Sequence, residues 1–162
     1  MAEVSELDPR DSGVIPAALV PAMILDGKKL GGELRAEVRG EVERLGAAGV
    51  IPGLAVVLVG DDLASATYVK NKTAACREVG MRVADHRLLA SATTADLLAM
   101  VAELNTDDEV DGILVQLPLP RGVDSAAVME AIDPRKDVDG FNAENVGLLH
   151  LGIAKLCLLR LH

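Results

Sequence analysis

Apolar and polar positions along the chain follow two alternating patterns, one typical of helices and one typical of buried strands. Residues 28–45 carry apolar side chains at helical spacing, at Leu30, Leu34, Val38, Val42 and Leu45. After a turn region over 46–53 that contains Pro52, residues 54–59 read Leu-Ala-Val-Val-Leu-Val. Such a continuous apolar run predicts a strand that is covered on both faces.

The alternation continues toward the C-terminus. The sequence predicts a helix over 63–79 ended by Gly80, a strand over 82–89 anchored by Val83 and Leu88, a helix from Thr93 or Thr94 to about Leu104, a strand over 112–116, and a short helix from Asp124 to Ile132. Leu117-Pro-Leu-Pro120 ends the third strand, because proline cannot donate to a ladder. Residues 134–141 are expected to form a charged loop, and residues 142–151 are compatible with another helix.

This order of elements predicts an α/β fold. Strand–helix–strand units with right-handed crossovers give a three-layer sandwich, with a mostly parallel sheet and helices on both faces. Ligands of such sheets bind outside the carboxyl ends of the strands. Val59-Gly60 and Gln116-Leu117 lie at two such ends, so we expect Tyr68, Lys72 and Gln116 to face one cleft.

Lys72 is the charged residue with the most unusual predicted surroundings. At about 100° per residue, it lies in the middle of a largely apolar helical stripe with Tyr68, Ala64, Ser65, Val69, Ala75, Cys76 and Val79. The opposite face holds Lys70, Thr73, Ala74 and Arg77. Lys72 is then either a desolvated catalyst of proton transfer or a lysine whose stem packs while its ammonium reaches water. We interpret Cys76 as a small core residue.

Composition excludes several classes of function. The 162 residues suit one domain, and a net charge of −9 disfavours binding to nucleic acid or to an anionic membrane. Tyr68 and Phe141 are the only aromatic residues, too few to stack bases. The cysteines and histidines are scattered without metal-ligand spacing, so we expect no metal site.

The N-terminal region lacks the features of a targeting segment. Residues 14–25 are apolar but short and interrupted by Pro16 and Pro21, and the stretch before them is mainly acidic. We therefore expect residues 1–21 to be a mobile tail and the protein to be cytoplasmic.

Three motifs carry chemistry when they are taken together. They are Val59-Gly60 with Ala64-Ser65, Tyr68-Val69 and Lys72; Gly112-Ile-Leu-Val-Gln-Leu-Pro-Leu-Pro120; and Lys136-Asp-Val-Asp-Gly-Phe141. Taken singly, Gln116 could merely satisfy loop backbone groups, and Asp139-Gly140 could be an ordinary solvated turn. In this order and spacing, however, the chain resembles the bifunctional methylenetetrahydrofolate dehydrogenase / methenyltetrahydrofolate cyclohydrolase family, from about Leu25 to Gly152.

The resemblance implies specific roles for residues at the matching positions. Lys72 corresponds to the catalytic lysine, and Gln116 to the residue that positions its amine. Tyr68 corresponds to the residue that stacks on the aminobenzoyl part of the folate, and Asp139 to the carboxylate that binds the pterin. With less support from the motifs, Ser65, Leu117 and Pro118 are expected to line the same substrate site.

The resemblance also implies an activity and its partners. Family members oxidise methylenetetrahydrofolate with NADP and hydrolyse the methenyl product to formyltetrahydrofolate, in one-carbon metabolism and purine biosynthesis. A homodimer is expected. Residues 22–150 correspond to the folate-binding catalytic domain. Residues 151–162 diverge from the expected interdomain helix, and the sequence has no Gly-x-Gly-x-x-Gly fingerprint, so we expect no cofactor-binding residues and no Rossmann domain here.

The expected absence of the dinucleotide-binding domain leaves alternative functions open. Hydride transfer would have no acceptor, whereas cyclohydrolase chemistry needs no nicotinamide. The chain could instead be a non-catalytic fragment that binds folate or a full-length subunit, or a truncation that does not fold stably.

Overall fold

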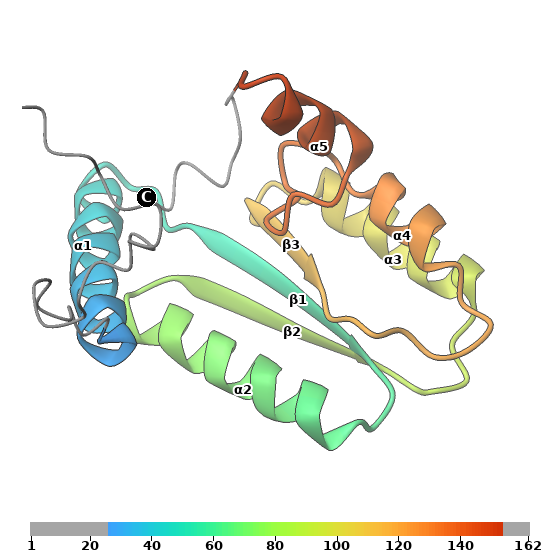
Figure 1. Cartoon of the computed structure of the whole chain (residues 1–162). Coiled ribbons are helices and arrows are strands. Elements are labelled where there is room, and N and C mark those ends of the chain that lie inside the picture. The colour runs from blue at the N-terminus through green and yellow to red at the C-terminus, as the bar shows by residue number, and fades with distance from the viewer. Residues whose placement is uncertain (1–25, 154–162) are drawn as a thin grey trace, which may run out of the picture.

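A parallel sheet of three strands organises residues 26–153, the part of the chain that this computed structural model describes (Figure 1). The strands are β1 (Gly53–Val59), β2 (Arg82–Leu88) and β3 (Gly112–Val115), in the spatial order β2-β1-β3. The central strand β1 runs parallel to both neighbours, with Val57 opposite His86 on one side and Val115 on the other. The predicted α/β fold with a parallel sheet is confirmed.

Helices cover both faces of this sheet. They are α1 (Gly27–Ala47), α2 (Leu63–Glu78), α3 (Thr94–Thr106), α4 (Ser125–Ala131) and α5 (Ala143–His150). In Figure 1, α2 lies on one face and α3 and α4 lie on the other, while α1 stands near the end where β1 begins. The predicted helices and strands are all present, with ends displaced by at most a few residues, as is usual for helix and strand boundaries.

Alternation along β1 divides the apolar core in two. Ala55, Val57 and Val59 point toward α3 and α4, where they pack with buried residues that include Leu97, Val101, Ile113, Val115 and Val128. Leu54, Val56 and Leu58 point the other way and pack with Val69 of α2 and Leu114 of β3. Every residue of β1 is buried, as its continuous apolar sequence predicts.

Side-chain caps and one glycine set the ends of the helices. Asp26, Asp62, Asp124 and Asn142 each accept a backbone N–H at the start of a helix, and Thr93 forms a capping box with Asp96. Gly80 follows α2 with φ of +95°, and the Met81 N–H bonds the Cys76 carbonyl. This Schellman arrangement confirms the predicted glycine stop.

Helix α1 differs from the others because none of its residues is buried. Its leucines Leu30, Leu34 and Leu45 are exposed, Leu30 by 57%. Contact with α2 is partly polar, since the Arg39 guanidinium lies 3.1 Å from the Glu78 carboxylate. No helix within residues 26–153 is both long enough and apolar enough to cross a membrane. The predicted mobile tail over 1–21 lies outside the described residues.

Candidate active site

Helix α2 presents Tyr68 and Lys72 side by side on its outer edge. They are one turn apart, and the Lys72 Nζ lies 5.4 Å from the centroid of the Tyr68 ring, within the range of a cation–π contact. Tyr68 is 60% exposed, and the Lys72 side chain keeps 37% of its surface accessible. Both side chains are therefore available to a ligand.

The predicted position of Lys72 in the middle of an apolar stripe is wrong. The buried residues of α2 are Ser65, Val69 and Thr73, so the inner face is centred near Val69 and includes Thr73, which we expected on the opposite face. Lys72 lies at the margin of this inner face and Tyr68 lies outside it. The helical pattern was ambiguous because alanines occur on several sides of α2 and do not mark which side packs on the sheet.

Asp139 completes a pair with Lys72 across the chain. Its Oδ1 lies 4.0 Å from the Lys72 Nζ, and 30% of the Asp139 side chain is exposed. Partial burial raises the pKa of the Asp139 carboxyl above its usual 3.8, the nearby Lys72 cation opposes this rise, and the like charge of Asp137 adds to it. The structure thus brings together the predicted residues Tyr68, Lys72 and Asp139.

Gln116 lies at the carboxyl end of the sheet, where it makes two hydrogen bonds. Its backbone N–H donates to the Val57 carbonyl just beyond β3, and its side-chain amide donates to the Leu117 carbonyl at 2.7 Å. This second bond satisfies a backbone carbonyl of the loop, which is one of the roles that the sequence left open for Gln116. Leu117 is partly exposed, and the Leu117–Pro118 peptide bond is cis.

Ser65 and Cys76 lie deeper than the Tyr68–Lys72 pair. Ser65 is buried in the first turn of α2, where its N–H donates to the Asp62 carboxylate at 2.7 Å. Cys76 packs partly buried against the apolar cluster under α2, as we expected of a small core residue. Burial raises the pKa of the Cys76 thiol, and the Lys72 and Arg77 cations partly oppose that rise.

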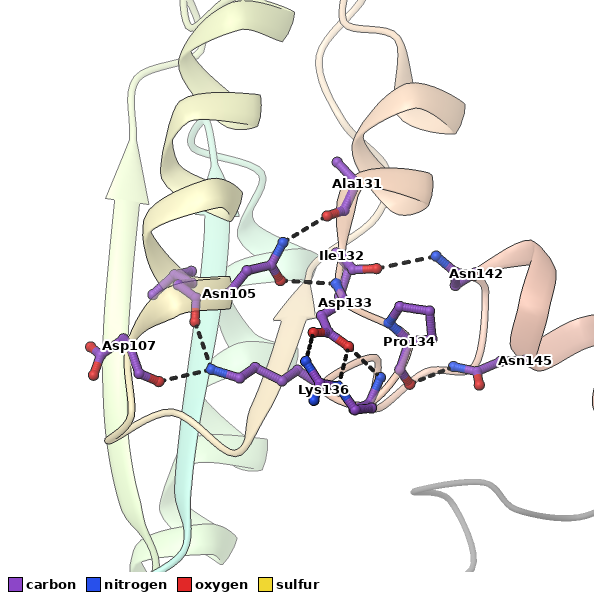
Figure 2. A network of polar contacts seen from close by, with 11 residues as sticks. Asn105, Asp107, Ala131, Ile132, Asp133, Pro134, Lys136, Asn142 and Asn145 are labelled. Atoms are coloured by element: carbon purple, nitrogen blue, oxygen red, sulfur yellow. Dashed lines mark hydrogen bonds and ion pairs between the residues drawn. The ribbon is translucent and has the colours of Figure 1, made fainter.

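The loop that carries Asp139 is anchored at its beginning by a polar network (Figure 2). The Lys136 Nζ donates to the carbonyls of Leu104 and Asp107, at 3.1 and 2.8 Å, and so caps the C-terminal end of α3. Asn105 donates to the Ala131 carbonyl and accepts from the Asp133 N–H, which ties α3 to the end of α4. The loop is therefore attached to the packed helices.

Asparagines of α5 anchor the other end of this loop. Asn142, the N-cap of α5, donates from its side-chain amide to the carbonyls of Glu130 and Ile132. Asn145 donates to the Pro134 carbonyl and to the Asp137 carboxylate, each at 2.9 Å. Figure 2 shows both asparagines pointing from α5 toward the loop.

These supporting residues were missed by sequence reasoning. Asp137, Asn142 and Asn145 are buried polar residues. Asp137 lies in the Lys136–Phe141 motif but was given no role of its own, and the two asparagines lie outside the motifs. Asn142 has a local signal, since asparagine before a short helical stretch is a favourable N-cap. Asp137 and Asn145 have none, because their partners are known only once α5 has packed beside the loop.

The described part of the chain shows no set of residues that matches a metal site or a dinucleotide site. Residues 26–153 contain no group of three His, Cys, Asp or Glu side chains arranged to hold a metal ion. The sequence also lacks the glycine fingerprint that brings a helix N-terminus against a pyrophosphate.

Fold and site together define an α/β protein with a lysine–carboxylate pair beside a parallel sheet. Residues 25–139 match the family model described as tetrahydrofolate dehydrogenase/cyclohydrolase, catalytic domain. The chain belongs to this family, as the motifs suggested.

Curated relatives agree with this assignment. The chain is 56% identical over 133 residues to the bifunctional protein FolD of Moorella thermoacetica, and these residues cover 82% of this chain and 48% of that protein. It is 54% identical over 129 residues to bifunctional protein FolD 2 of Geobacter metallireducens, covering 80% of this chain and 45% of that protein. The chain thus spans about half the length of the curated relatives that it matches.

Solved structures share the fold. The bifunctional FolD methylenetetrahydrofolate dehydrogenase/cyclohydrolase of Campylobacter jejuni superposes with a TM-score of 0.81 at 42% identity, over 86% of this chain and 52% of that one. The Trypanosoma brucei FolD enzyme, solved with an NADP cofactor and an inhibitor, gives 0.78 at 35% identity, over 82% and 46%.

Proposed function

We propose that residues 22–150 are the folate-binding catalytic domain of a methylenetetrahydrofolate dehydrogenase / methenyltetrahydrofolate cyclohydrolase. The observation that carries the proposal is the position of Lys72, between the Tyr68 ring and the Asp139 carboxylate, in a chain of this family. The substrates are tetrahydrofolate derivatives.

Each member of the site offers chemistry that a folate requires. A pterin presents adjacent N–H groups, and the two oxygens of the Asp139 carboxylate can accept them together. The exposed Tyr68 ring offers a face on which the aminobenzoyl ring can stack. Ser65, Leu117 and Pro118 are proposed to line the same site, with Leu117 and Pro118 close to the end of β3.

Lys72 is proposed to manage protons during hydrolysis of the methenyl bridge. Water adds to the methenyl carbon and loses one proton, which leaves a hydroxyl group on that carbon. The hydroxyl then loses its proton as the formyl C=O forms, the bond from the carbon to one folate nitrogen breaks, and that nitrogen takes up a proton, so that one proton is released overall. The Lys72 amine can exchange protons at either point, because its side chain reaches the solvent-accessible edge of α2. Gln116 is proposed to position the amine by accepting a hydrogen bond on its side-chain oxygen.

The dehydrogenase reaction needs a hydride acceptor, for which NADP is proposed. Residues 26–153 would hold the folate for that reaction. A homodimer and a cytoplasmic location in one-carbon metabolism and purine biosynthesis are proposed with it. The outer edge of β2, unpaired within residues 26–153, and the exposed leucines of α1 are surfaces that a second subunit could cover.

The proposed hydrolysis can be tested by the decay of methenyltetrahydrofolate absorbance in the presence of the purified chain. Lys72→Met keeps the stem but removes the proton-carrying amine, so we expect hydrolysis to fall by about 100-fold or more. Lys70→Met is the matched control, because Lys70 is an exposed lysine of the same helix, two residues away.

Two results would contradict the proposed role of Lys72. Equal hydrolysis by the wild type and Lys72→Met would remove Lys72 from the chemistry, whereas equal losses in Lys70→Met and Lys72→Met would point to a general effect of charge. NADP-dependent oxidation of methylenetetrahydrofolate by this chain alone would show that it holds a dinucleotide site which its sequence does not predict.

A further inference from the structure

The segment before Asp139 continues the sheet beside β3. Asp137 forms an isolated parallel bridge with Ile113, and the Ile113 N–H donates to the Lys136 carbonyl at 2.7 Å. The contact is tight, because a Cβ added at Gly112 would meet the Val138 Cγ1 at 2.6 Å. The backbone entering the Asp139 turn is therefore held against the strand itself.

Asp137 has a side chain that is buried and fully engaged. Only 2% of Asp137 is exposed, yet it carries a carboxylate. Its Oδ1 accepts the Gly140 N–H at 3.0 Å, and its Oδ2 accepts the Asn142 N–H and the Asn145 side-chain amide, both at 2.9 Å. Three donors converge on the two oxygens, which compensates the burial of a charge that would otherwise be costly.

These bonds enclose the residue that faces Lys72. Asp139 lies between Asp137 and Gly140, so the bond from the Gly140 N–H to Asp137 closes a turn around it. Gly140 has φ of +69°, a conformation that glycine adopts without strain. With the backbone fixed on both sides of Asp139, its side chain is left to point toward α2, where its Oδ1 lies 4.0 Å from the Lys72 Nζ.

We propose that Asp137 is a positioning residue that fixes the Asp139 carboxylate opposite Lys72 by binding the N–H groups on the far side of the Asp139 turn. The inference rests on the proposed function for its consequence, the binding of a folate by Asp139. A carboxylate is required, since both oxygens must accept. An asparagine at this position would present an NH₂ group to at least one of the three donors.

The test compares Asp137→Asn with Asp133→Asn in the full chain. Asp133 is a carboxylate of the same loop, but its side chain bonds Arg135 and not the Asp139 turn. Affinity for tetrahydrofolate is measured by anaerobic calorimetry. We expect Asp137→Asn to raise the Kd at least tenfold and Asp133→Asn to change it less than twofold. Similar Kd values for wild type and Asp137→Asn, or equal losses in the two variants, would overturn the inference.

A second measurement does not depend on folate binding. The pKa of the Asp139 carboxyl, followed by ¹³C NMR, should rise when Lys72→Met removes the nearby cation. In the Asp137→Asn background we expect this response to Lys72→Met to disappear, because Asp139 no longer stays beside Lys72, whereas it should persist with Asp133→Asn. A full response in Asp137→Asn would overturn the inference.

These two measurements separate the inference from the function on which it rests. If the wild-type chain binds no tetrahydrofolate, the proposed function fails and the NMR response alone decides the role of Asp137. If Asp137→Asn does not fold, Asn145→Ala replaces it, since this variant removes one of the three donors. We then expect a smaller rise in Kd, of about threefold, and a weakened response to Lys72→Met, and no change in either would overturn the inference.

Discussion

The two charged members of the candidate site are held in opposite ways. Lys72 belongs to a regular helix, yet its side chain lies at the edge of α2, beside the Tyr68 ring and the Asp139 carboxylate. Asp139 belongs to a loop, yet buried polar groups fix the backbone on both sides of it. Loop residues whose neighbours satisfy every polar group can be more rigid than side chains on a helix surface. The arrangement suits an Asp139 carboxylate that is held in one position and a Lys72 amine that can move.

The largest expected effect comes from a variant that disrupts the buried polar groups around the Asp139 loop. Asn142→Ala removes a buried side chain that donates to two carbonyls and accepts the Glu144 N–H at the start of α5. The unpaired groups should lower the free energy of unfolding by about 2–3 kcal/mol, measured by urea denaturation. Lys72→Met, on the exposed half, should cost less than about 0.5 kcal/mol. Similar losses in the two variants would remove the difference between the two regions.

A smaller effect concerns the contact between the loop and β3. Gly112→Ala places a methyl group against Val138, so the loop must shift, at a cost of about 1–3 kcal/mol. Adding Val138→Ala removes the obstructing methyl groups, and the double variant should then be more stable than the sum of the two single losses predicts. Thermal or urea unfolding of the four proteins measures this coupling. If the losses of stability in the two single variants simply add in the double variant, the close contact between Gly112 and Val138 does not position the loop.

The smallest effect compares two carboxylates of the loop by their pH dependence. Hydrogen bonds from Arg135 lower the pKa of Asp133 to about 2. The contribution of ionised Asp133 to the free energy of unfolding is therefore present above pH 3.8 and is lost as pH falls toward 2. Burial raises the pKa of Asp139 above 3.8, so its ionisation destabilises the fold as pH rises through the raised value.

Opposite slopes should therefore appear in the free energy of unfolding. Relative to Asp133→Asn, the wild type should gain stability as pH rises from 2 to 4, by about 1 kcal/mol because Arg135 is exposed to solvent. Relative to Asp139→Asn, the wild type should lose stability as pH rises above 3.8. Slopes of the same sign would contradict the different environments of the two carboxyl groups.

Most of the fold is predictable from the sequence because it depends on local patterns. The apolar run of β1, the caps at Thr93 and Asp124, and the stop at Gly80 all act within a few residues, and the structure confirms each. The motifs also identify the family, and with it Lys72, Tyr68 and Asp139 as residues of interest. Their catalytic and binding roles remain predictions, as do those of Gln116, Ser65, Leu117 and Pro118.

Tertiary structure decides which side of α2 is buried and what supports Asp139. The stripe centred on Lys72 was a wrong prediction, since a helix rich in alanine does not reveal its packed face until a sheet covers it. Asp137 looked like part of a charged turn, but its partner Asn145 arrives from α5 and its backbone partner Ile113 from β3. Contacts between separate elements depend on how these elements pack, and packing is not a property of any short stretch of sequence.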